Sequence, residues 1–123
     1  MANKVKVTCL VSNSVMVDSK YQAEHALALL VEVGMTRILF DTGANSEILQ
    51  HNAKIMDLDI SRFKYIVLSH GHQDHTGGLE WVLTQTRQPL IVTDAAIFSK
   101  KSVREGKEYK ANGISITRDK IQT

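Results

Sequence analysis

Short apolar runs separated by polar stretches follow one another along this chain. Residues 4–12, KVKVTCLVS, alternate apolar and polar side chains, which predicts a strand. Residues 24–33, EHALALLVEV, are apolar on both faces, as in a strand buried on two sides, although a helix is also compatible with so much Ala and Leu. The turn GMT and the run RILFD at residues 37–41 follow at once and favour a hairpin.

Beyond residue 44 the apolar residues recur with a helical period. A helix is predicted to begin near Asn45 or Ser46, because either side chain can cap the free amides of a first turn. Its apolar side consists of Ile48, Leu49, Ala53, Ile55, Met56 and Leu58. Residues 64–70, KYIVLSH, then form a continuous apolar run that is typical of a central strand.

The last third of the chain continues the alternation of helices and strands. Residues 77–86 are predicted to form a short helix with Leu79, Val82 and Leu83 facing inward. The elements predicted after it are a strand at 89–94, a helix at 95–105, a charged loop at 106–113 and a strand at 114–117, with no helix beyond that strand.

This order of elements indicates one domain, residues 1–123, of the α/β class, with a mixed sheet and helices on one face. The two-sided apolar strands then leave the other face of the sheet apolar. Because exposing such a face is costly and promotes association, we expect a partner to cover it.

Composition and charge narrow the classes of partner. The chain is 43% hydrophobic and 23% charged, as in ordinary globular proteins, and its net charge of +2 gives no reason to expect nucleic acid or a membrane. The longest apolar run, ALALLV, is too short to cross a bilayer. The single cysteine, Cys9, is expected to be a buried structural thiol. With no disulfide and no signal-peptide pattern, we expect a cytoplasmic protein.

Three of the five histidines and one aspartate crowd into residues 70–75, HGHQDH, where the predicted central strand ends. Ligand sites in α/β sheets concentrate at such strand ends. Imidazole nitrogens and carboxylates bind zinc at about 2.0–2.2 Å. Two histidines one residue apart can converge on one ion, and the adjacent Asp–His pair can reach a second. The segment therefore predicts a metal site, whereas His25 and His51 are expected to be solvated.

The segment SHGHQDHTGG matches the HxHxDH signature of the metallo-β-lactamase superfamily, and ILFDTGAN resembles the strand-end Asp-Thr-Gly element of that family. The resemblance runs through nearly the whole chain and is greatest to the 7,8-dihydropterin-6-yl-methyl-4-(β-D-ribofuranosyl)aminobenzene 5′-phosphate synthase-like group. It implies half of an αββα sandwich. It also implies a divalent metal, zinc first, with up to two ions and with manganese or iron as alternatives.

The resemblance implies a role for each residue of the cluster. His70 and His72 would bind the first metal, and Asp74 and His75 would bind the second. The metals would activate a water to attack an ester, amide or phosphodiester bond of a small-molecule substrate. Asp74 would also act as the catalytic carboxylate that orients this water or moves its proton.

Two further residues are implied as supports of the metal ligands. Asp41 of the Asp-Thr-Gly element would hold the metal loop by hydrogen bonds, although a plain turn former before Gly43 is an equal interpretation. Thr76, directly after the cluster, would support the ligands in the same way.

The family pattern is incomplete in this chain. Family members have two related halves, and the second half supplies further histidines and a bridging aspartate, but residues 76–123 contain no histidine. The chain thus resembles an amino-terminal half, expected to pair with itself as a homo-oligomer or with a missing carboxyl-terminal half. Three functions stay open: a metal-dependent hydrolase, a non-catalytic metal-binding or interaction module, and a di-iron redox relative.

Overall fold

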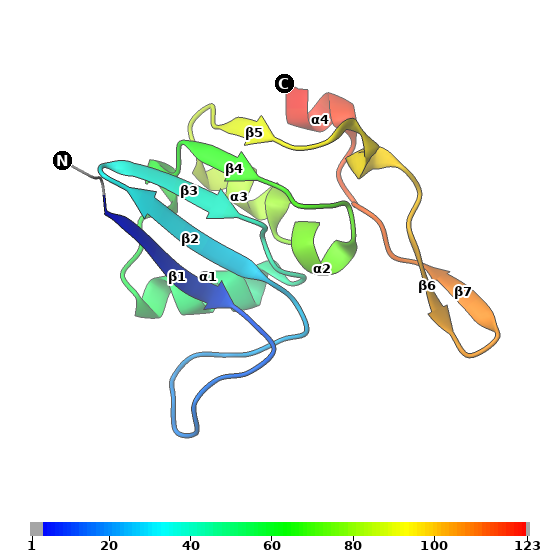
Figure 1. The fold of residues 1–123 in the computed structure, drawn as a ribbon, viewed down its shortest axis with the longest axis horizontal. Helices are drawn as coiled ribbons and strands as arrows, with labels where there is room; N and C mark the ends of the chain where they lie inside the picture. Colours follow the sequence, from blue (N-terminus) through cyan, green and yellow to red (C-terminus); the bar gives the residue numbers. More distant parts are fainter. Residues whose placement is uncertain (1–3, 123) are drawn as a thin grey trace.

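The centre of the molecule is a sheet of five strands in the order β1-β2-β3-β4-β5 (Figure 1). The computed structural model describes residues 4–122. Strands β1 to β3 pair antiparallel, whereas β3, β4 and β5 pair parallel, so the predicted mixed sheet is confirmed. The strands are β1 (Val5–Val11), β2 (Ala28–Val33), β3 (Thr36–Phe40), β4 (Tyr65–Val67) and β5 (Leu90–Val92).

Helical segments connect the parallel strands and follow them. They are α1 (Ser46–Ile55), η1 (Ile60–Arg62), α2 (Gln73–Thr76), α3 (Leu79–Gln85), η2 (Ala95–Phe98) and α4 (Arg118–Gln122). The predicted cap of the first helix is confirmed, because the Asn45 side chain accepts a hydrogen bond of 2.9 Å from the amide of Glu47. This bond satisfies one of the amides that a first helical turn leaves free.

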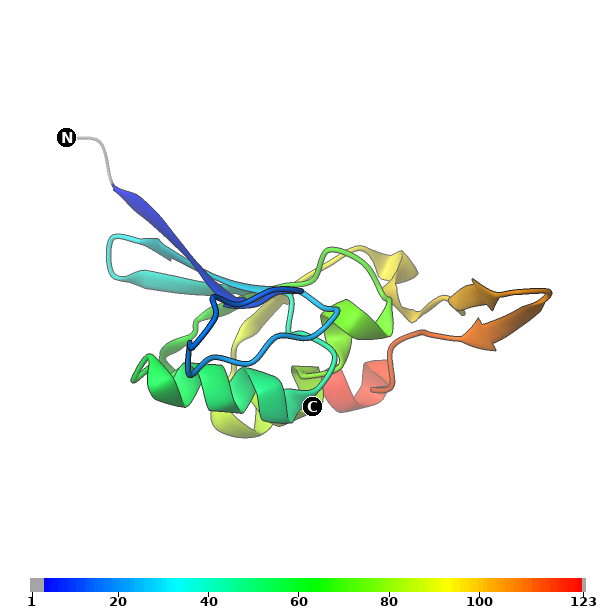
Figure 2. The same ribbon diagram turned by 90° about the horizontal axis from the view of Figure 1, so that it is seen from below.

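One face of the sheet packs on α1 and α3, which Figure 2 shows beneath the strands. Fully buried residues of the strands and of the two helices meet there, and each such side chain contributes roughly 1.5–3 kcal/mol to the free energy of unfolding. These residues include Leu10, Leu30, Leu39 and Ile66 of the sheet and Leu49, Ala53, Leu79 and Val82 of the helices. We call this side of the sheet the covered face.

The opposite side, here called the open face, is apolar and partly or fully accessible. Directly paired residues lie on the same face of a sheet, so the strand register groups the residues of this face into rows. The rows are Val5–Val33–Thr36, Val7–Val31–Ile38–Tyr65–Leu90 and Cys9–Leu29–Phe40–Val67–Val92. None of these residues is buried, and Val5, Val7, Leu90 and Val92 are more than half exposed. The prediction of a buried thiol at Cys9 is wrong, because Cys9 lies in an edge strand on this face.

The carboxyl-terminal third differs from its prediction. The helix predicted at 95–105 is wrong: a single 3₁₀ turn, η2, is followed by β6 (Ser102–Glu105), which pairs antiparallel with β7 (Glu108–Ala111). The predicted loop at 106–113 therefore contains a strand. Gly106 takes a φ of +62° in the turn between them, a conformation open to glycine at little cost. Figures 1 and 2 show this hairpin projecting from the body.

Two further predicted boundaries were wrong. The strand predicted at 114–117 is irregular, and α4 follows it, so a helix does come after this segment. Ile116 is buried there and joins the core under the covered face. The strand predicted from residue 24 begins only at Ala28, and the residues before it belong to the connection between β1 and β2.

Candidate metal centre

The histidine cluster lies where β3 and β4 end. These strands are parallel, so their carboxyl ends meet at one edge of the sheet. Asp41 follows β3 directly, and Ser69 and His70 come two and three residues after β4. The remaining members of the cluster lie in the loop after β4 and in α2 (Figure 1). The sequence prediction that the cluster leaves a central strand is confirmed.

Asp41 organises this edge through three hydrogen bonds. Its carboxylate is fully buried and accepts from the Ser69 amide at 2.8 Å, from the Ser69 hydroxyl at 2.6 Å and from Nδ1 of His75 at 2.7 Å. Its own amide donates to the carbonyl of Val67 at 2.8 Å. Asp41 also has a φ of +60°, which is uncommon for a residue other than glycine. It turns the chain and holds the cluster, so both interpretations of this residue apply.

The same bonds fix the orientation of two imidazoles. A carboxylate only accepts, so Nδ1 of His75 carries the proton that it donates to Asp41. The Ser69 hydroxyl uses its one proton on Asp41, and its oxygen then accepts from Nδ1 of His70 at 2.9 Å. Both rings therefore present Nε2 with a free lone pair. A hydrogen bond at the other ring nitrogen is the usual way in which proteins orient metal-binding histidines.

The ligand atoms of His70, Asp74 and His75 all lie within 4.8 Å of one another. Two donors on a single zinc ion lie at most about 4.4 Å apart, twice the bond length, so small side-chain shifts suffice for these three to share one ion. The ring centroids of His70 and His75 are 4.2 Å apart, and Oδ2 of Asp74 is 3.6 Å from Nε2 of His75. The residues thus fit a divalent cation.

His72 stands next to this group without belonging to it. Its ring centroid is 5.0 Å from that of His70, with the ring planes at 76°. It is the N-cap residue of α2, and its carbonyl accepts from the hydroxyl of Thr76 at 3.0 Å. Thr76 is buried and holds the backbone of the loop, so its contact is with the main chain at His72 and not with an imidazole.

Electrostatics favour neutral imidazole at His70. Burial lowers the pKa of His70, and the neighbouring imidazoles of His75 and His72 lower this pKa further, while Asp41 and Asp74 oppose the shift. Neutral imidazole is the form that binds metals. A lowered pKa therefore keeps His70 ready to bind a cation at weakly acidic pH.

The loop after β3 and the segment around α2 pack backbone against backbone. The Thr42 amide donates to the carbonyl of His75 at 2.8 Å, and the Thr42 hydroxyl donates to the same oxygen at 3.0 Å. The Gly77 amide donates to Gly43 at 2.8 Å, and a Cβ on Gly77 would overlap the carbonyl of Ala44. The loop that supports the ligands and the segment that carries them, which are distant in sequence, are thus held together.

A cavity of about 330 Å³ opens beside the cluster. Its wall brings His70, His72 and Asp74 together with residues from the β1–β2 connection and from the hairpin. The complete wall is His25, His70, His72, Gln73, Asp74, Val103 and Asn112. The prediction that His25 is solvated is confirmed, since it is exposed, and the structure adds that it borders this cavity.

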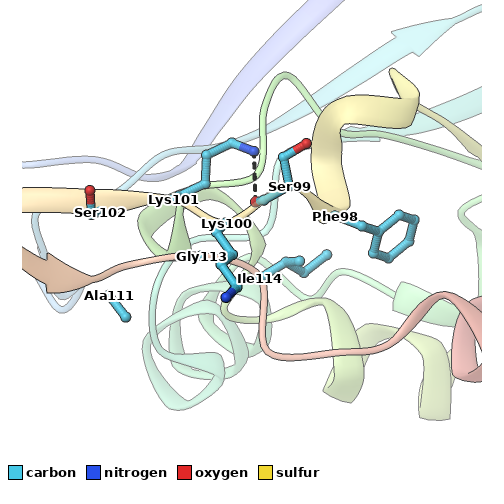
Figure 3. Close-up of a pocket in the computed structure, with 8 residues that line it drawn as sticks. All are labelled: Phe98, Ser99, Lys100, Lys101, Ser102, Ala111, Gly113 and Ile114. Atoms are coloured by element: carbon cyan, nitrogen blue, oxygen red, sulfur yellow. Dashed lines mark hydrogen bonds between the residues drawn. The ribbon is translucent and has the colours of Figure 1, made fainter.

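A larger cavity of about 750 Å³ lies at the base of the hairpin (Figure 3). It offers Phe98 and Ile114 as apolar wall and two lysines as charged groups. The ammonium of Lys101 donates to the carbonyls of Ala96 and Ser99, at 2.7 and 3.0 Å. Its lining includes none of the predicted metal ligands, so the smaller cavity is the one that matches the chemistry of the cluster.

Sequence reasoning missed Ser69 and Thr42 as supports of this site. Both lie inside the quoted motifs, Ser69 directly before the first histidine and Thr42 within Asp-Thr-Gly. A hydroxyl at the end of a buried apolar strand was the available signal, because such a group needs a hydrogen-bond partner. What the sequence could not supply was the identity of that partner, which comes from the other loop.

Comparison with known proteins identifies the family. The family model described as "Metallo-beta-lactamase superfamily" matches residues 22–119. The "Uncharacterized protein MJ0448" of Methanocaldococcus jannaschii is 45% identical over 64 residues, which are 52% of this chain and 25% of that protein. The 7,8-dihydropterin-6-methyl-4-(beta-D-ribofuranosyl)-aminobenzene-5'-phosphate synthase of the same organism is 30% identical over 94 residues, 73% of this chain and 32% of that enzyme.

Among solved structures, the "Rm3 metallo-beta-lactamase" superposes with a TM-score of 0.50 at 26% identity, covering 82% of this chain and 37% of that one. The chain thus spans about a quarter to two fifths of these three relatives. The sheet with helices on one face is the corresponding part of their fold. Because the family match includes both loops of the metal centre and most of the chain, this protein belongs to the metallo-β-lactamase superfamily.

Proposed function

We propose that this chain is the metal-binding half of a hydrolase that uses water activated by a divalent cation. The observation that carries the proposal is the set of three donors within 4.8 Å, two of them imidazoles, of which the buried Asp41 carboxylate holds one directly and the other through the Ser69 hydroxyl. A bound cation, zinc first and manganese or iron as alternatives, would supply Lewis acidity and lower the pKa of water toward neutrality.

The residues of the chain divide the remaining work. His70 and His75 would bind the cation through Nε2, because Ser69 and Asp41 hold these rings by hydrogen bonds at Nδ1. Asp74 belongs to the donor group and also lines the open cavity. Its carboxylate can therefore orient the attacking water and accept its proton. With one cation, His70, Asp74 and His75 would share it. With two, His70 and His72, which lines the same cavity, would hold the first, and Asp74 and His75 would hold the second.

The proposed substrate is a small molecule with an ester, amide or phosphodiester bond. The cavity of about 330 Å³ is of the size that ligand sites of this kind have. The names of the relatives include a phosphate synthase and a β-lactamase, which act on different compounds, so the proposal is stated at the level of the bond that water attacks.

Metal analysis combined with turnover tests the proposal. The protein should retain stoichiometric zinc after dialysis, and a generic phosphodiester or lactone should be hydrolysed at a rate that His72→Ala and Asp74→Ala abolish. Retained metal without turnover would instead support a non-catalytic metal-binding module. That second function is favoured by one observation, the absence of histidine from residues 76–123. Protein that retains no zinc, manganese or iron contradicts both.

We also propose that the open face is covered by a second layer supplied by the other half of the family fold. Three rows of apolar side chains reach across the sheet, and the relatives have at least as much chain again outside the matched region. Stacked sheets pack about 10 Å apart through such faces. The 123-residue chain by itself should therefore self-associate through the open face, which light scattering after size-exclusion chromatography would measure.

A further inference from the structure

We propose that His25 is a substrate-contacting residue of this site, which donates a hydrogen bond to an oxyanion group of the molecule bound in the cavity. The inference rests on the proposed function and names the wall of the cavity that recognises the substrate. It is carried by the anchoring of the chain around His25, by the position of its ring, and by the kind of groups that share the cavity with it.

The connection between β1 and β2 is tied down on the approach to His25. The buried amide side chain of Asn52 in α1 bonds both main-chain groups of Gln22, accepting from its amide at 2.9 Å and donating to its carbonyl at 2.9 Å. The carboxylate of Glu24 then accepts from the amides of Ala44 and Asn45, each at 3.2 Å. The residue before His25 is thus fixed to the loop that follows β3.

The chain is tied down again after His25. The amide of Leu27 donates to the carbonyl of Asp74 at 3.3 Å, and the carbonyl of Leu27 accepts from Gly43 at 2.9 Å. His25 therefore sits on a short bridge whose two ends are bonded to the two loops of the metal centre. A mobile surface loop would not place an imidazole reproducibly, but this bridge does.

His25 borders the cavity but does not belong to the donor group. His25 lines the cavity together with His70, His72 and Asp74, yet it is outside the group of three donors within 4.8 Å. Within residues 4–122 its ring has no hydrogen-bond partner. His51, the other histidine outside the cluster, differs in this respect, because its Nε2 bonds the carbonyl of Lys20 at 2.7 Å. The free donor of His25 is thus available to whatever fills the cavity.

The groups that share the cavity indicate an oxyanion. Beside the three histidines, the cavity is lined by Gln73, Asn112 and a single carboxylate, Asp74. The Gln73 side chain already donates to the carbonyl of Ala44 at 2.8 Å, so the Asn112 amide is the one that remains to donate. A cation at the donor group would add positive charge on one side. Phosphate and carboxylate groups bind where cations and N–H donors converge. His25 lies where it can donate to the oxygens that the cation does not hold.

Cobalt(II) as a coloured stand-in for zinc allows metal binding and anion binding to be measured separately. The full chain and its His25→Ala, His25→Gln and His51→Ala variants are titrated with cobalt, followed by absorbance, and the loaded proteins are then titrated with inorganic phosphate and with acetate. Cobalt affinity should be the same in all four proteins. Phosphate or acetate affinity should fall about tenfold in His25→Ala, partly recover in His25→Gln, which keeps an N–H donor, and stay unchanged in His51→Ala.

The outcomes separate this inference from the proposed function. A tighter response to phosphate than to acetate assigns the group to a phosphoryl compound, and the reverse assigns it to a carboxylate. Equal anion affinity in His25→Ala and the parent, or no anion response in a cobalt-loaded parent, overturns the inference alone. A tenfold loss of cobalt affinity in His25→Ala overturns it in favour of a metal ligand. A parent that binds no cobalt ends the proposed function and this inference together.

Discussion

The two faces of the sheet have similar apolar composition but opposite environments. On the covered face, on the side of α1 and α3, Leu39 is fully buried, whereas its neighbour Ile38 on the open face stays partly exposed. The two residues follow one another in β3 and differ only in the side of the sheet to which they point. One interface of this layer is complete, and the other still needs a partner.

The metal centre takes its support from the layer that is present and not from a partner of the open face. Asp41 and Ser69 stand at the ends of β3 and β4, and their hydrogen bonds stay within the strand ends and loops of this one layer. This one layer therefore holds the ligand cluster in place by itself. A second layer would add ligands and substrate contacts, but it is not required to hold the histidines that are already present.

The largest expected effect is a difference in the free energy of unfolding between substitutions on the two faces. Leu39→Ala should lower the free energy of unfolding by about 2–5 kcal/mol, because it leaves a cavity in a closed core. Ile38→Ala, its matched control in the same strand, should cost less than half as much because its side chain keeps contact with water. Urea unfolding followed by circular dichroism measures both, at a protein concentration at which light scattering shows a monomer. Equal losses there would mean that the open face is buried within the monomer.

The next effect tests whether this layer alone holds the metal centre. Asp41→Asn removes the charge that accepts from His75 and Ser69, and metal affinity should fall about 10- to 100-fold. Asp59→Asn is the control, because Asp59 also accepts from a main-chain amide, that of Ser61, but lies at the start of η1. Competition with a coloured chelator measures the affinities. An unchanged affinity in Asp41→Asn would show that the support comes from elsewhere.

A third prediction concerns association through the open face. Val7→Lys places a charge in the central row of that face, so the self-association constant of the chain should fall about tenfold, since burying an unpaired charge is costly. Val17→Lys is the control, because Val17 is 91% exposed in the β1–β2 connection and belongs to none of the rows. Light scattering over a concentration series gives the constants. Equal constants would place the contact elsewhere.

The smallest expected effect is a pH dependence of the metal-free protein. Burial lowers the pKa of His70 below its ordinary value of about 6.5, so the unfolded chain binds this proton more readily than the folded one. Stability should then be unaffected by His70 above pH 6.5 and should fall as the pH drops from there toward the lowered pKa. Titration of the ring signals by nuclear magnetic resonance measures the shift. A midpoint above 6.5 would mean that Asp41 and Asp74 outweigh burial.

The central strands and the metal loop were predictable because each carries its own local signal. The apolar run that ends in β4 and the Asn45 cap of α1 depend on neighbours in sequence, and both are confirmed. His70, Asp74 and His75 come together as donors, and their role as metal ligands stays a prediction. The spacing placed His72 with His70, whereas the structure sets it beside the group of three.

The errors share a different cause, which is dependence on a distant partner. Residues 102–111 form a hairpin because two charged segments pair around Gly106, and neither segment is apolar enough to show a strand. Cys9 is exposed because its strand is at the sheet edge and faces the open side, which a single run of residues cannot reveal. The place of His25 beside the cavity also depends on distant partners, because hydrogen bonds of Asn52 and Glu24 hold the β1–β2 connection in position.

The fully buried carboxylate of Asp41 has a consequence for how the protein acquires its ion. Small zinc domains collapse around the metal and unfold when a chelator removes it. Here the rings are oriented by protein atoms in advance, so loading should be a late and reversible event that follows folding. A chelator should strip the ion and lower the melting temperature only by what loss of a bound ligand requires, while the sheet stays folded.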